Sequence, residues 1–483
     1  MHRLDSGKIL AIDDRYMHAD DQVRTTTHPF QKDDANPVEQ RFSEWETSGS
    51  VPGLVLPDSA AGGYRMFFSS YHHEMGIYPT GMAISADGLS WAKHPDYLDD
   101  RDYAGKDRTY QGMSVCCHSQ AAADDFRFYA MVVFREDKGK KLPFRVHFKR
   151  SRDGLVWEWL ERERYWTGCS DVINIIWDTQ RQRFVSYHKV WRVVGVDEHG
   201  GRFQGYFTAF IPTETGDGKV RIVGKRLFCD PADRAVDRLL MLGEGATGEG
   251  GGGYTTDVFQ MIRVVARAES TDFVTWENNT VILEPPPGAA PDEQSYGMPV
   301  FEYGGMYLAL PRYFLGISGK LNVRTAWSTD GVDFTAPEVD TIDCGAPGTW
   351  DCGMVLAAAE PLVLGDRLCV YYGGYNVDHT QDDGNFQMRP GRAWLRMDGF
   401  ASRAGGTLST VPLVSRARQL HINGTGTIGV VVESAAGQML HSARWQGDST
   451  DAQVVSAEGP LHEDAFRIRF DLNSGELYSF RLA

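Results

Sequence analysis

A seven-residue pattern that occurs four times constrains the fold of this chain more than any other feature. The pattern is Ser, any residue, Asp, usually Gly, two further residues and an aromatic residue, and its copies occupy residues 85–91, 151–157, 270–276 and 328–334. Each copy lies between alternating apolar runs, so Asp-Gly is expected to form the positive-φ turn of a β-hairpin. A hairpin that recurs along a chain is typical of a β-propeller, in which one repeat forms one blade.

The spacing of the copies predicts the number of blades. Their serines are 66, 119 and 58 residues apart, so two intervals are about one blade long and the third holds about one blade plus an insertion of similar size. Four blades are therefore expected before residue 340, and three apolar strands in residues 350–397 predict a fifth. Ser-x-Asp-Gly is also common turn chemistry, so the prediction depends on the repetition and not on any single copy.

The length and composition agree with an all-β fold of more than one domain. A chain of 483 residues is too long for one compact core, and 52 Gly, 21 Pro and 12% aromatic residues favour short strands and tight turns. We predict a five-bladed β-propeller over residues 1–397, with an insertion over 193–257 in the third blade, and a β-sandwich over 398–483. The apolar strand Ile9–Ile12 is expected to complete the last blade and close the ring.

The insertion contains a glycine-rich tract over residues 248–253, which cannot pack a core. The Lys and Ser/Thr of a phosphate-binding P-loop are missing there, so a lid or a partner-binding loop at one rim is the preferred interpretation. If the segment crosses to a neighbouring subunit, the chain forms a homo-oligomer, and deletion of 193–257 would change the oligomeric state.

Charge and cysteine content narrow the classes of partner. A net charge of -16 without a basic stripe argues against nucleic acid and leaves a neutral ligand such as a sugar compatible. The seven cysteines are odd in number and lack zinc-site spacing, so free thiols are expected. No apolar run of 18 residues and no signal-like N-terminus is present, which predicts no membrane span and a cytoplasmic location, with export left open.

Five blades followed by a sandwich, with Asp398-Gly399-Phe400 at the junction, resemble the invertase-like glycoside hydrolases and their bacterial relatives in the arabinanase and fructosidase clan. Short motifs carry the similarity over nearly the whole chain, and they lie at residues 23–25, 28–29, 36–38, 45–46, 64–66, 371–374 and 379. The family's N-terminal Trp-Met-Asn-Asp-Pro-Asn-Gly motif is absent. Its Arg-Asp-Pro motif is reduced to Ser170-Asp171-Val172, and its Glu-Cys motif to Glu293-Gln294.

The resemblance implies a hydrolase or transglycosylase that acts on furanosides such as fructosides or arabinofuranosides, without a cofactor. Glycoside cleavage needs one carboxylic acid to protonate the leaving oxygen and a second carboxylate as nucleophile or base. By resemblance, Glu46 is the nucleophile or base, Asp171 stabilises the oxocarbenium-like state and Glu293 is the general acid. Each has a plainer alternative, since Glu46 and Glu293 could be surface charges and Asp171 could cap a turn. Asp351, at the start of the fifth blade, is a fourth candidate acid.

Sugar recognition is expected to use aromatic rings for stacking and polar side chains for hydroxyl groups. The candidates near the inner strands are Trp45, Tyr296, Trp350, Asp351, Tyr372 and His379. His118 and His188 are isolated histidines, which are more often hydrogen-bonded structural residues than ligands, so no metal is predicted. The repeated aspartates of the turn pattern are expected to serve the turns and not catalysis.

Two other functions stay open at this point. A phosphorylase of the five-bladed mannoside type would need a basic cluster in the funnel, and Arg312, Arg324 and Arg392 are available but scattered in the sequence. Phosphate-dependent turnover would identify it. A non-catalytic carbohydrate-binding protein would keep the aromatic residues without paired acids, and it would bind sugars without releasing a product.

Overall fold

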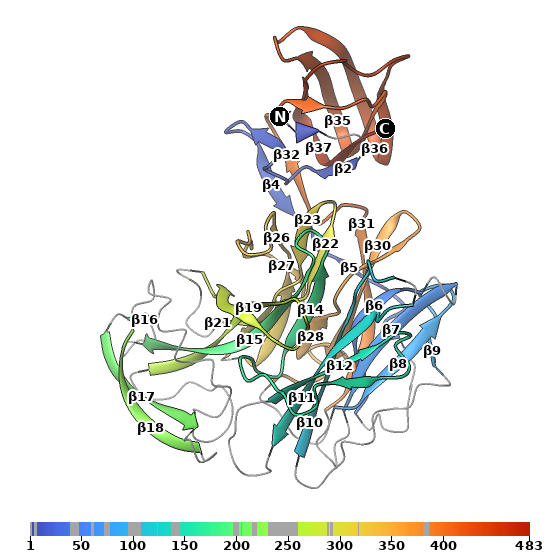
Figure 1. Cartoon of the computed structure of the whole chain (residues 1–483). Helices are drawn as coiled ribbons and strands as arrows, with labels where there is room; N and C mark the ends of the chain where they lie inside the picture. The colour runs from blue at the N-terminus through green and yellow to red at the C-terminus, as the bar shows by residue number, and fades with distance from the viewer. Residues whose placement is uncertain are drawn as a thin grey trace.

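The computed structural model is built from strands and turns (Figure 1). It describes residues 2–3, 7–38, 48–58, 62–71, 78–94, 108–122, 124–136, 145–196, 202–203, 205–214, 220–229, 259–286, 289, 293–316, 318–379 and 386–483. Every regular element in these ranges is a strand, so the all-β prediction is confirmed. Accordingly, these ranges contain no helix of the length and apolar character that crossing a membrane requires.

The first three blades are antiparallel sheets whose strands follow the chain order. Blade one consists of β6 (Ser50–Asp58), β7 (Gly63–Ser70), β8 (Thr80–Ser85) and β9 (Ala92–Lys93). Blade two consists of β10 (Arg108–Cys117), β11 (Phe128–Glu136), β12 (Arg145–Ser151) and β13 (Glu158–Leu160). Blade three consists of β14 (Ile173–Asp178), β15 (Arg183–Val196), β19 (Phe259–Ser270) and β20 (Glu277–Leu283).

In blade four, short interruptions divide the strands. Its strands are β21 (Glu293–Gly297) and β22 (Val300–Tyr303), β23 (Met306–Ala309) and β24 (Arg312–Leu315), β25 (Lys320–Arg324) and β26 (Ala326–Ser328), and β27 (Asp340–Ile342). Two interruptions fall at Pro299 and Pro311, which have no N–H to give to a ladder. Their carbonyl oxygens still accept, from Leu310 N at 2.9 Å and from Arg324 N at 2.9 Å, so the sheet continues past each proline.

Blade five is completed by a strand from the N-terminal segment. It contains β28 (Met354–Ala357), β29 (Leu362–Leu364), β30 (Arg367–Tyr375), β31 (Met388–Arg396) and β5 (Gln31–Lys32). β5 pairs antiparallel with β31 through Ala393 and Trp394. A single parallel bridge between Leu321 and Met354 joins blades four and five into one hydrogen-bonded sheet. The prediction of five blades, with closure by an N-terminal strand, is therefore confirmed.

The identity of the closing strand was predicted wrongly. β2 (Gly7–Leu10) pairs with the C-terminal strand β37 (Phe466–Leu482) and not with the last blade. The physical reason is that this segment is apolar on both faces: Ile9 and Ala11 pack in the core of the C-terminal sheet, whereas Leu10 and Ile12 pack against blades four and five. A strand that fills two cores lies between the two parts of the molecule, as Figure 1 shows.

The C-terminal β-sandwich is one hydrogen-bonded network built around three long strands, β35 (Gln419–Ser434), β36 (Met439–Ser456) and β37. Shorter strands pair along β37 or extend from its neighbours, namely β1 (His2–Arg3), β3 (Met17–Ala19), β4 (Arg24–Thr27), β32 (Ala401–Ala404), β33 (Thr407–Thr410) and β34 (Leu413–Val414). Strands from residues 2–27 thus hydrogen-bond to the C-terminal sheet. The division at residues 397 and 398 into independent domains stays a prediction.

The repeated pattern forms the turn between the third and fourth strands of four blades. In the first copy, Asp87 Oδ1 accepts hydrogen bonds from Leu89 N and Ser90 N at 2.8 Å each, and from Ser85 Oγ at 2.9 Å. These bonds lower the pKa of Asp87 to about 2. The fourth residue of each copy has positive φ, which is 72° at Gly88 and 65° even at Phe273. The expected turn chemistry is confirmed.

The turns also connect neighbouring blades. Tyr371 in blade five donates to Gly88 O in blade one, and Trp91 Nε1 donates to the Tyr371 hydroxyl at 2.7 Å. Tyr187 in blade three donates to Gly331 O in blade four at 2.9 Å. These two turns therefore each meet a tyrosine of the preceding blade, and the contact between Tyr371 and Gly88 connects the last blade to the first.

Within the predicted insertion, the structure describes the backbone of three strands. β16 (Arg202–Phe203) extends the sheet of blade three, and β17 (Gly205–Glu214) pairs with β18 (Val220–Cys229) as a separate hairpin. The glycine tract at 248–253 lies outside the described residues.

Candidate active site

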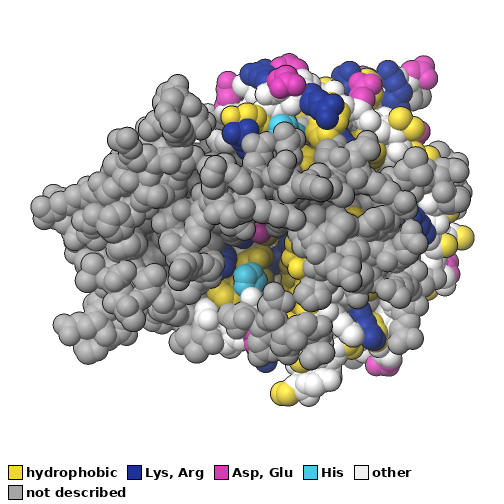
Figure 2. All heavy atoms as spheres, turned by 90° about the horizontal axis from the view of Figure 1, so that it is seen from below, with side chains coloured by type: hydrophobic (Ala, Val, Ile, Leu, Met, Phe, Trp, Pro, Cys, Tyr) yellow, Lys and Arg dark blue, Asp and Glu magenta, His cyan; other side chains and the backbone are white. Residues whose placement is uncertain are grey.

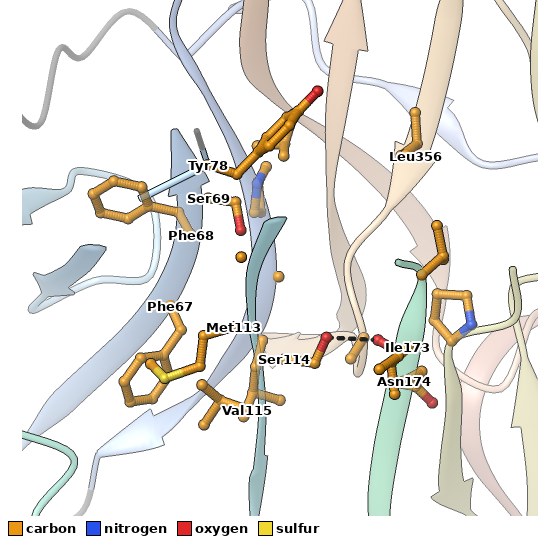
Figure 3. A pocket seen from close by; sticks show the side chains of 18 of the residues that line it. Phe67, Phe68, Ser69, Tyr78, Met113, Ser114, Val115, Ile173, Asn174 and Leu356 are labelled. Atoms are coloured by element: carbon orange, nitrogen blue, oxygen red, sulfur yellow. Dashed lines mark hydrogen bonds between the residues drawn. The ribbon is translucent and has the colours of Figure 1, made fainter. Parts of the chain in front are cut away.

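The first strands of the five blades surround a cavity of about 240 Å³ on the propeller axis. Two polar contacts join neighbouring first strands here: Ser114 Oγ donates to Ile173 O at 2.9 Å, and Asn174 Oδ1 accepts from Val300 N at 2.8 Å. Figure 3 shows Phe67 and Phe68 on one side of this cavity and Asn174 on the opposite side. The axis is thus a partly polar space enclosed by all five blades.

A second cavity of about 260 Å³ adjoins the first and has aromatic walls. Tyr78, Tyr296 and Tyr375 line both cavities, and Phe386 lies with its ring centroid 5.4 Å from that of Tyr375. In the view from below, a hollow is visible in which hydrophobic and histidine side chains are seen (Figure 2). Aromatic walls with a few polar groups are the usual lining of a site for a small ligand.

Asp171, two residues before the start of β14, places a carboxylate at the wall of the axial cavity. Lys189 Nζ, on β15, lies 2.6 Å from Asp171 Oδ1, and Ser170 Oγ donates to the same oxygen at 2.9 Å. Burial alone would raise the pKa of Asp171, but the Lys189 charge and these hydrogen bonds outweigh burial and hold this pKa below its usual value. Asp171 is therefore ionised at neutral pH.

Tyr296, on β21, connects this ion pair to His379. The Lys189 ammonium lies 4.6 Å from the centroid of the Tyr296 ring, and the Tyr296 hydroxyl is 2.9 Å from His379 Nε2. Burial, together with the charges of Arg263 and Lys189, lowers the pKa of His379. The imidazole is therefore neutral at pH 7, when one of its nitrogens can accept a hydrogen bond. Asp171, Tyr296 and His379 are the predicted site residues that the structure brings together.

Glu293 lies elsewhere in blade four. Arg324 Nη1 and Nη2 donate to its two carboxylate oxygens at 3.0 and 3.1 Å, and Arg324 Nε donates to Asp340 at 2.8 Å. Glu293 is 6% exposed and does not line the two cavities just described. Tyr296 lies where the register of β21 against β24 shifts, between Ser295 and Gly297, and it lines both cavities whereas Glu293 pairs with Arg324. Its role as general acid stays a prediction.

Three further candidates gather on blade five, away from the axis. The rings of Trp350 and Tyr372 are stacked with centroids 5.6 Å apart, and the Tyr372 hydroxyl donates to Asp351 Oδ2 at 3.2 Å. Lys32 Nζ, from the closing strand, lies 2.5 Å from the same oxygen. Tyr372 is fully buried among the apolar residues of blades four and five. These contacts connect β5 to blade five, and substrate binding by the three residues stays a prediction.

Trp45 and Glu46 lie outside the described residues. The sequence argument also missed residues that the structure places at the site, namely Lys189, Arg263 and Asp378. Lys189 could have been found from the sequence, because it is a charged residue within the mostly apolar strand 184–190. A lysine that is buried in such a strand needs a partner of opposite charge. Asp378 directly precedes His379 and lines the aromatic cavity beside it. The charges of Asp171 and Asp378 both raise the pKa of His379 and so oppose the lowering by burial.

No group of three or more metal-ligating side chains occurs within the described ranges. His188 is buried and hydrogen-bonds to Asn279 Oδ1 at 3.1 Å, and His118 stacks on Trp177 with ring centroids 3.7 Å apart. Both histidines therefore have structural partners. The six described cysteines are free thiols.

The fold and the cavities define a propeller–sandwich protein with a cavity on the propeller axis. No family model and no curated protein matches the chain.

Solved glycoside hydrolases resemble the chain in architecture. An exo-inulinase from Aspergillus awamori is 11% identical over 93% of this chain and 99% of its own, with a TM-score of 0.40. A family-43 arabinoxylan arabinofuranohydrolase from Bacillus subtilis is 11% identical over 94% and 99%, with a TM-score of 0.37. A glycosyl hydrolase from Bacteroides ovatus is 11% identical over 77% and 94%, with a TM-score of 0.46. These values are too low to support any statement on activity.

Proposed function

We propose that this chain is a glycoside hydrolase whose substrate binds in the adjoining cavities on the propeller axis. The observation that carries the proposal is the ionised Asp171 carboxylate in a cavity that shares three tyrosines with an aromatic-walled neighbour. Aromatic faces suit the apolar faces of sugar rings, and a fixed negative charge suits the positive charge that develops during glycoside cleavage. The volumes of about 240 and 260 Å³ together suit a small ligand.

The protonation state of Asp171 decides which role it takes. A carboxylate held in the charged form by Lys189 cannot donate a proton at neutral pH, so it serves as the stabiliser of the oxocarbenium-like state or as the nucleophile. Glu46 is the proposed nucleophile or base, as the sequence resemblance implies. For the general acid, Glu293 and Asp378 compete, because Glu293 matches the family's acid motif whereas Asp378 lines the aromatic cavity.

The proposed substrates are furanosides such as fructosides or arabinofuranosides. This choice depends on the sequence resemblance, and the cavities are compatible with any small sugar. A panel of aryl furanosides and aryl pyranosides, assayed for release of the aryl group, tests the choice of sugar ring separately from the choice of reaction. Hydrolysis of pyranosides alone would retain the glycosidase and remove the furanoside specificity.

The decisive experiment compares Asp171→Asn with Glu269→Gln. Asp171→Asn should lower turnover by at least about a hundredfold, the low end of what carboxylate catalysis contributes. Glu269 is a matched control, because it is also paired with cations, Arg183 and Arg267 at 2.6 Å each, but it lies outside the cavities. Normal turnover of Asp171→Asn, or equal losses in both variants, would contradict the proposal.

The general acid is identified by its dependence on the leaving group. Removing this acid harms substrates with poor leaving groups far more than aryl glycosides, because a good leaving group needs little protonation in the transition state. Glu293→Gln and Asp378→Asn are therefore each assayed on an aryl glycoside and on a disaccharide. The variant that loses activity only on the disaccharide marks the general acid. Near-normal activity of Glu293→Gln on the disaccharide would exclude Glu293 from this role.

A further inference from the structure

One arginine reaches the axial cavity from the second strand of its blade. Arg312 is the first residue of β24, which lies behind the inner strand β21, and it nevertheless lines the axial cavity. The side chain passes Gly297, where the register of β21 against β24 shifts. A Cβ atom at Gly297 would lie 3.8 Å from Arg312 Cδ and Nη1 and only 2.7 Å from Val172 Cγ1. The space left by the glycine is thus filled by Val172, and the Arg312 side chain packs beside it at ordinary van der Waals distance.

The Arg312 guanidinium has no carboxylate partner among the described residues. Its Nη2 donates to Ala357 O at 2.5 Å, whereas its Nε is buried and without an acceptor in that part of the chain. Two other buried arginines, by contrast, are paired with carboxylates. Arg324 has Glu293 and Asp340, and Arg65 donates twice to Asp58 Oδ2, at 3.0 and 2.6 Å.

A guanidinium without a counter-ion is costly for the free protein. Burial lowers the pKa of Arg312 to about 10, and the named neighbours that oppose this change are the phenols of Tyr375 and Tyr296, not an acid. A buried charge is normally paired or hydrogen-bonded to a charged group. An arginine without a counter-ion at the wall of a cavity is suited to bind an anionic ligand. Its planar array of N–H donors matches the oxygens of a carboxylate or phosphate.

We propose that Arg312 binds an oxyanion, either a carboxylate on the substrate sugar or a phosphate, in the axial cavity. This proposal extends the function proposed above. It rests on that function in one respect, namely that the ligand is a glycoside. The repulsion between Asp171 and such a ligand is reduced, because the Lys189 ammonium lies 2.6 Å from the carboxylate and attracts the same anion. If the anion is a carboxylate, the substrates are glycosides of acidic sugars. If it is phosphate, the substrates are glycosides that are cleaved while phosphate is bound at Arg312.

The test is calorimetric titration of the full chain at low ionic strength with sodium phosphate, with the methyl glycoside of a uronic acid, and with a neutral methyl glycoside. At least one of the two anions should bind, and Arg312→Gln should weaken that binding by at least about tenfold, because hydrogen bonds to charged groups are lost. The affinity of Arg312→Lys for the anion should lie between those of the wild type and Arg312→Gln, since an ammonium keeps the charge but lacks the paired donors of a guanidinium. Arg183→Gln, a surface arginine paired with Glu269, is the control.

The outcomes separate the sources of the anion. Binding of phosphate but not of the uronide points to free phosphate, and binding of the uronide but not of phosphate points to a sugar carboxylate. Binding of neither anion, or equal binding by wild type and Arg312→Gln, overturns the proposal. Because calorimetry measures binding without turnover, the anion site can be confirmed even if no glycoside is hydrolysed, and refuted even if one is.

Thermal melting of the variants tests whether a loss of anion binding is caused by a loss of folding. Arg312→Gln removes an uncompensated charge, so its melting temperature without ligand should equal or exceed that of the wild type. Arg65→Gln, which breaks a complete ion pair, should melt lower. If Arg312→Gln melts far below the wild type, the binding data of the charge-retaining Arg312→Lys variant decide the question.

Discussion

Lys189 Nζ lies 2.6 Å from Asp171 Oδ1, and the lysine side chain is 1% exposed. This pair joins the second strand of blade three to a residue two positions before its first strand, and it controls the pKa of a carboxylate at the wall of the axial cavity. Because Lys189 holds the pKa of Asp171 down, the lysine should control the pH at which the carboxylate becomes active.

The first prediction therefore concerns Lys189→Met. Without the ammonium, burial raises the pKa of Asp171, so the acidic limb of the profile of kcat/KM against pH should move upward by about one pH unit or more, each unit corresponding to about 1.4 kcal/mol. Lys149→Met removes another buried lysine, which lies over Trp159, and should leave the acidic limb in place. An unchanged limb in Lys189→Met would mean that Asp171 does not limit activity at low pH.

The second prediction concerns Tyr296→Phe. The substitution removes the hydroxyl that meets His379 at 2.9 Å but keeps the ring beside Lys189. The lost hydrogen bond no longer positions His379 at the cavity wall, so KM should rise by up to about tenfold, and the melting temperature should fall modestly because a bond of about 0.5–1.5 kcal/mol is lost. In Tyr187→Phe the lost bond is to Gly331 O between blades, so this variant should melt lower with an unchanged KM. Steady-state kinetics and thermal melting separate the two effects.

The third prediction concerns acid stability and the repeated turns. The folded pKa of Asp87 is lowered to about 2 from an ordinary value near 4, so this carboxylate stabilises the fold above about pH 4. That contribution should be lost as the pH falls through about 2. Asp87→Asn should therefore lower the melting temperature at pH 7 and narrow its difference from the wild type at pH 2, without loss of activity. A constant difference between pH 7 and pH 2 would contradict the linkage.

These turns explain why most of the fold could be predicted from the sequence. Ser85, Asp87 and Gly88 act through hydrogen bonds and a positive φ that depend only on residues nearby in the chain. Such local chemistry leaves a pattern in the sequence, and its repetition counts the blades. Closure by β5 left no such pattern, because a two-residue strand carries no periodicity. The more apolar segment around Ile9 was therefore predicted to be the closing strand instead of β5.

The site could be predicted only in part, because it depends on which side chains of different blades share one space. Asp171 and His379 were identified as site residues, but no spacing in the sequence indicates that Arg312, on the second strand of its blade, lines the axial cavity. Glu293 and Tyr296 lie three residues apart on β21, and the register of this strand shifts at Tyr296, so the acid and the aromatic residue have different surroundings. Residue type alone does not reveal this difference.

The last prediction concerns the junction between propeller and sandwich, where Asp398 is 1% exposed and has a φ of 61°. Its Oδ1 accepts from Lys8 Nζ at 2.7 Å and from the Tyr303 hydroxyl at 2.6 Å, and its Oδ2 accepts from Ser479 Oγ at 2.6 Å. One carboxylate thus joins the N-terminal strand, blade four and the last strand of the sandwich.

Asp398→Ala leaves these donors without an acceptor, and losing one partner of a buried charged network costs about 3–5 kcal/mol. The melting temperature should fall by several degrees, and calorimetry should show two transitions where the wild type shows one, because the propeller and the sandwich no longer unfold together. Asp14→Ala is the control, since Asp14 pairs with Arg403 at 2.8 Å but its side chain is 71% exposed, and such a surface pair contributes at most about 1 kcal/mol. A single transition in Asp398→Ala at the wild-type temperature would show that apolar packing of Leu10 and Ile12 against the propeller, and not the carboxylate, couples the two parts.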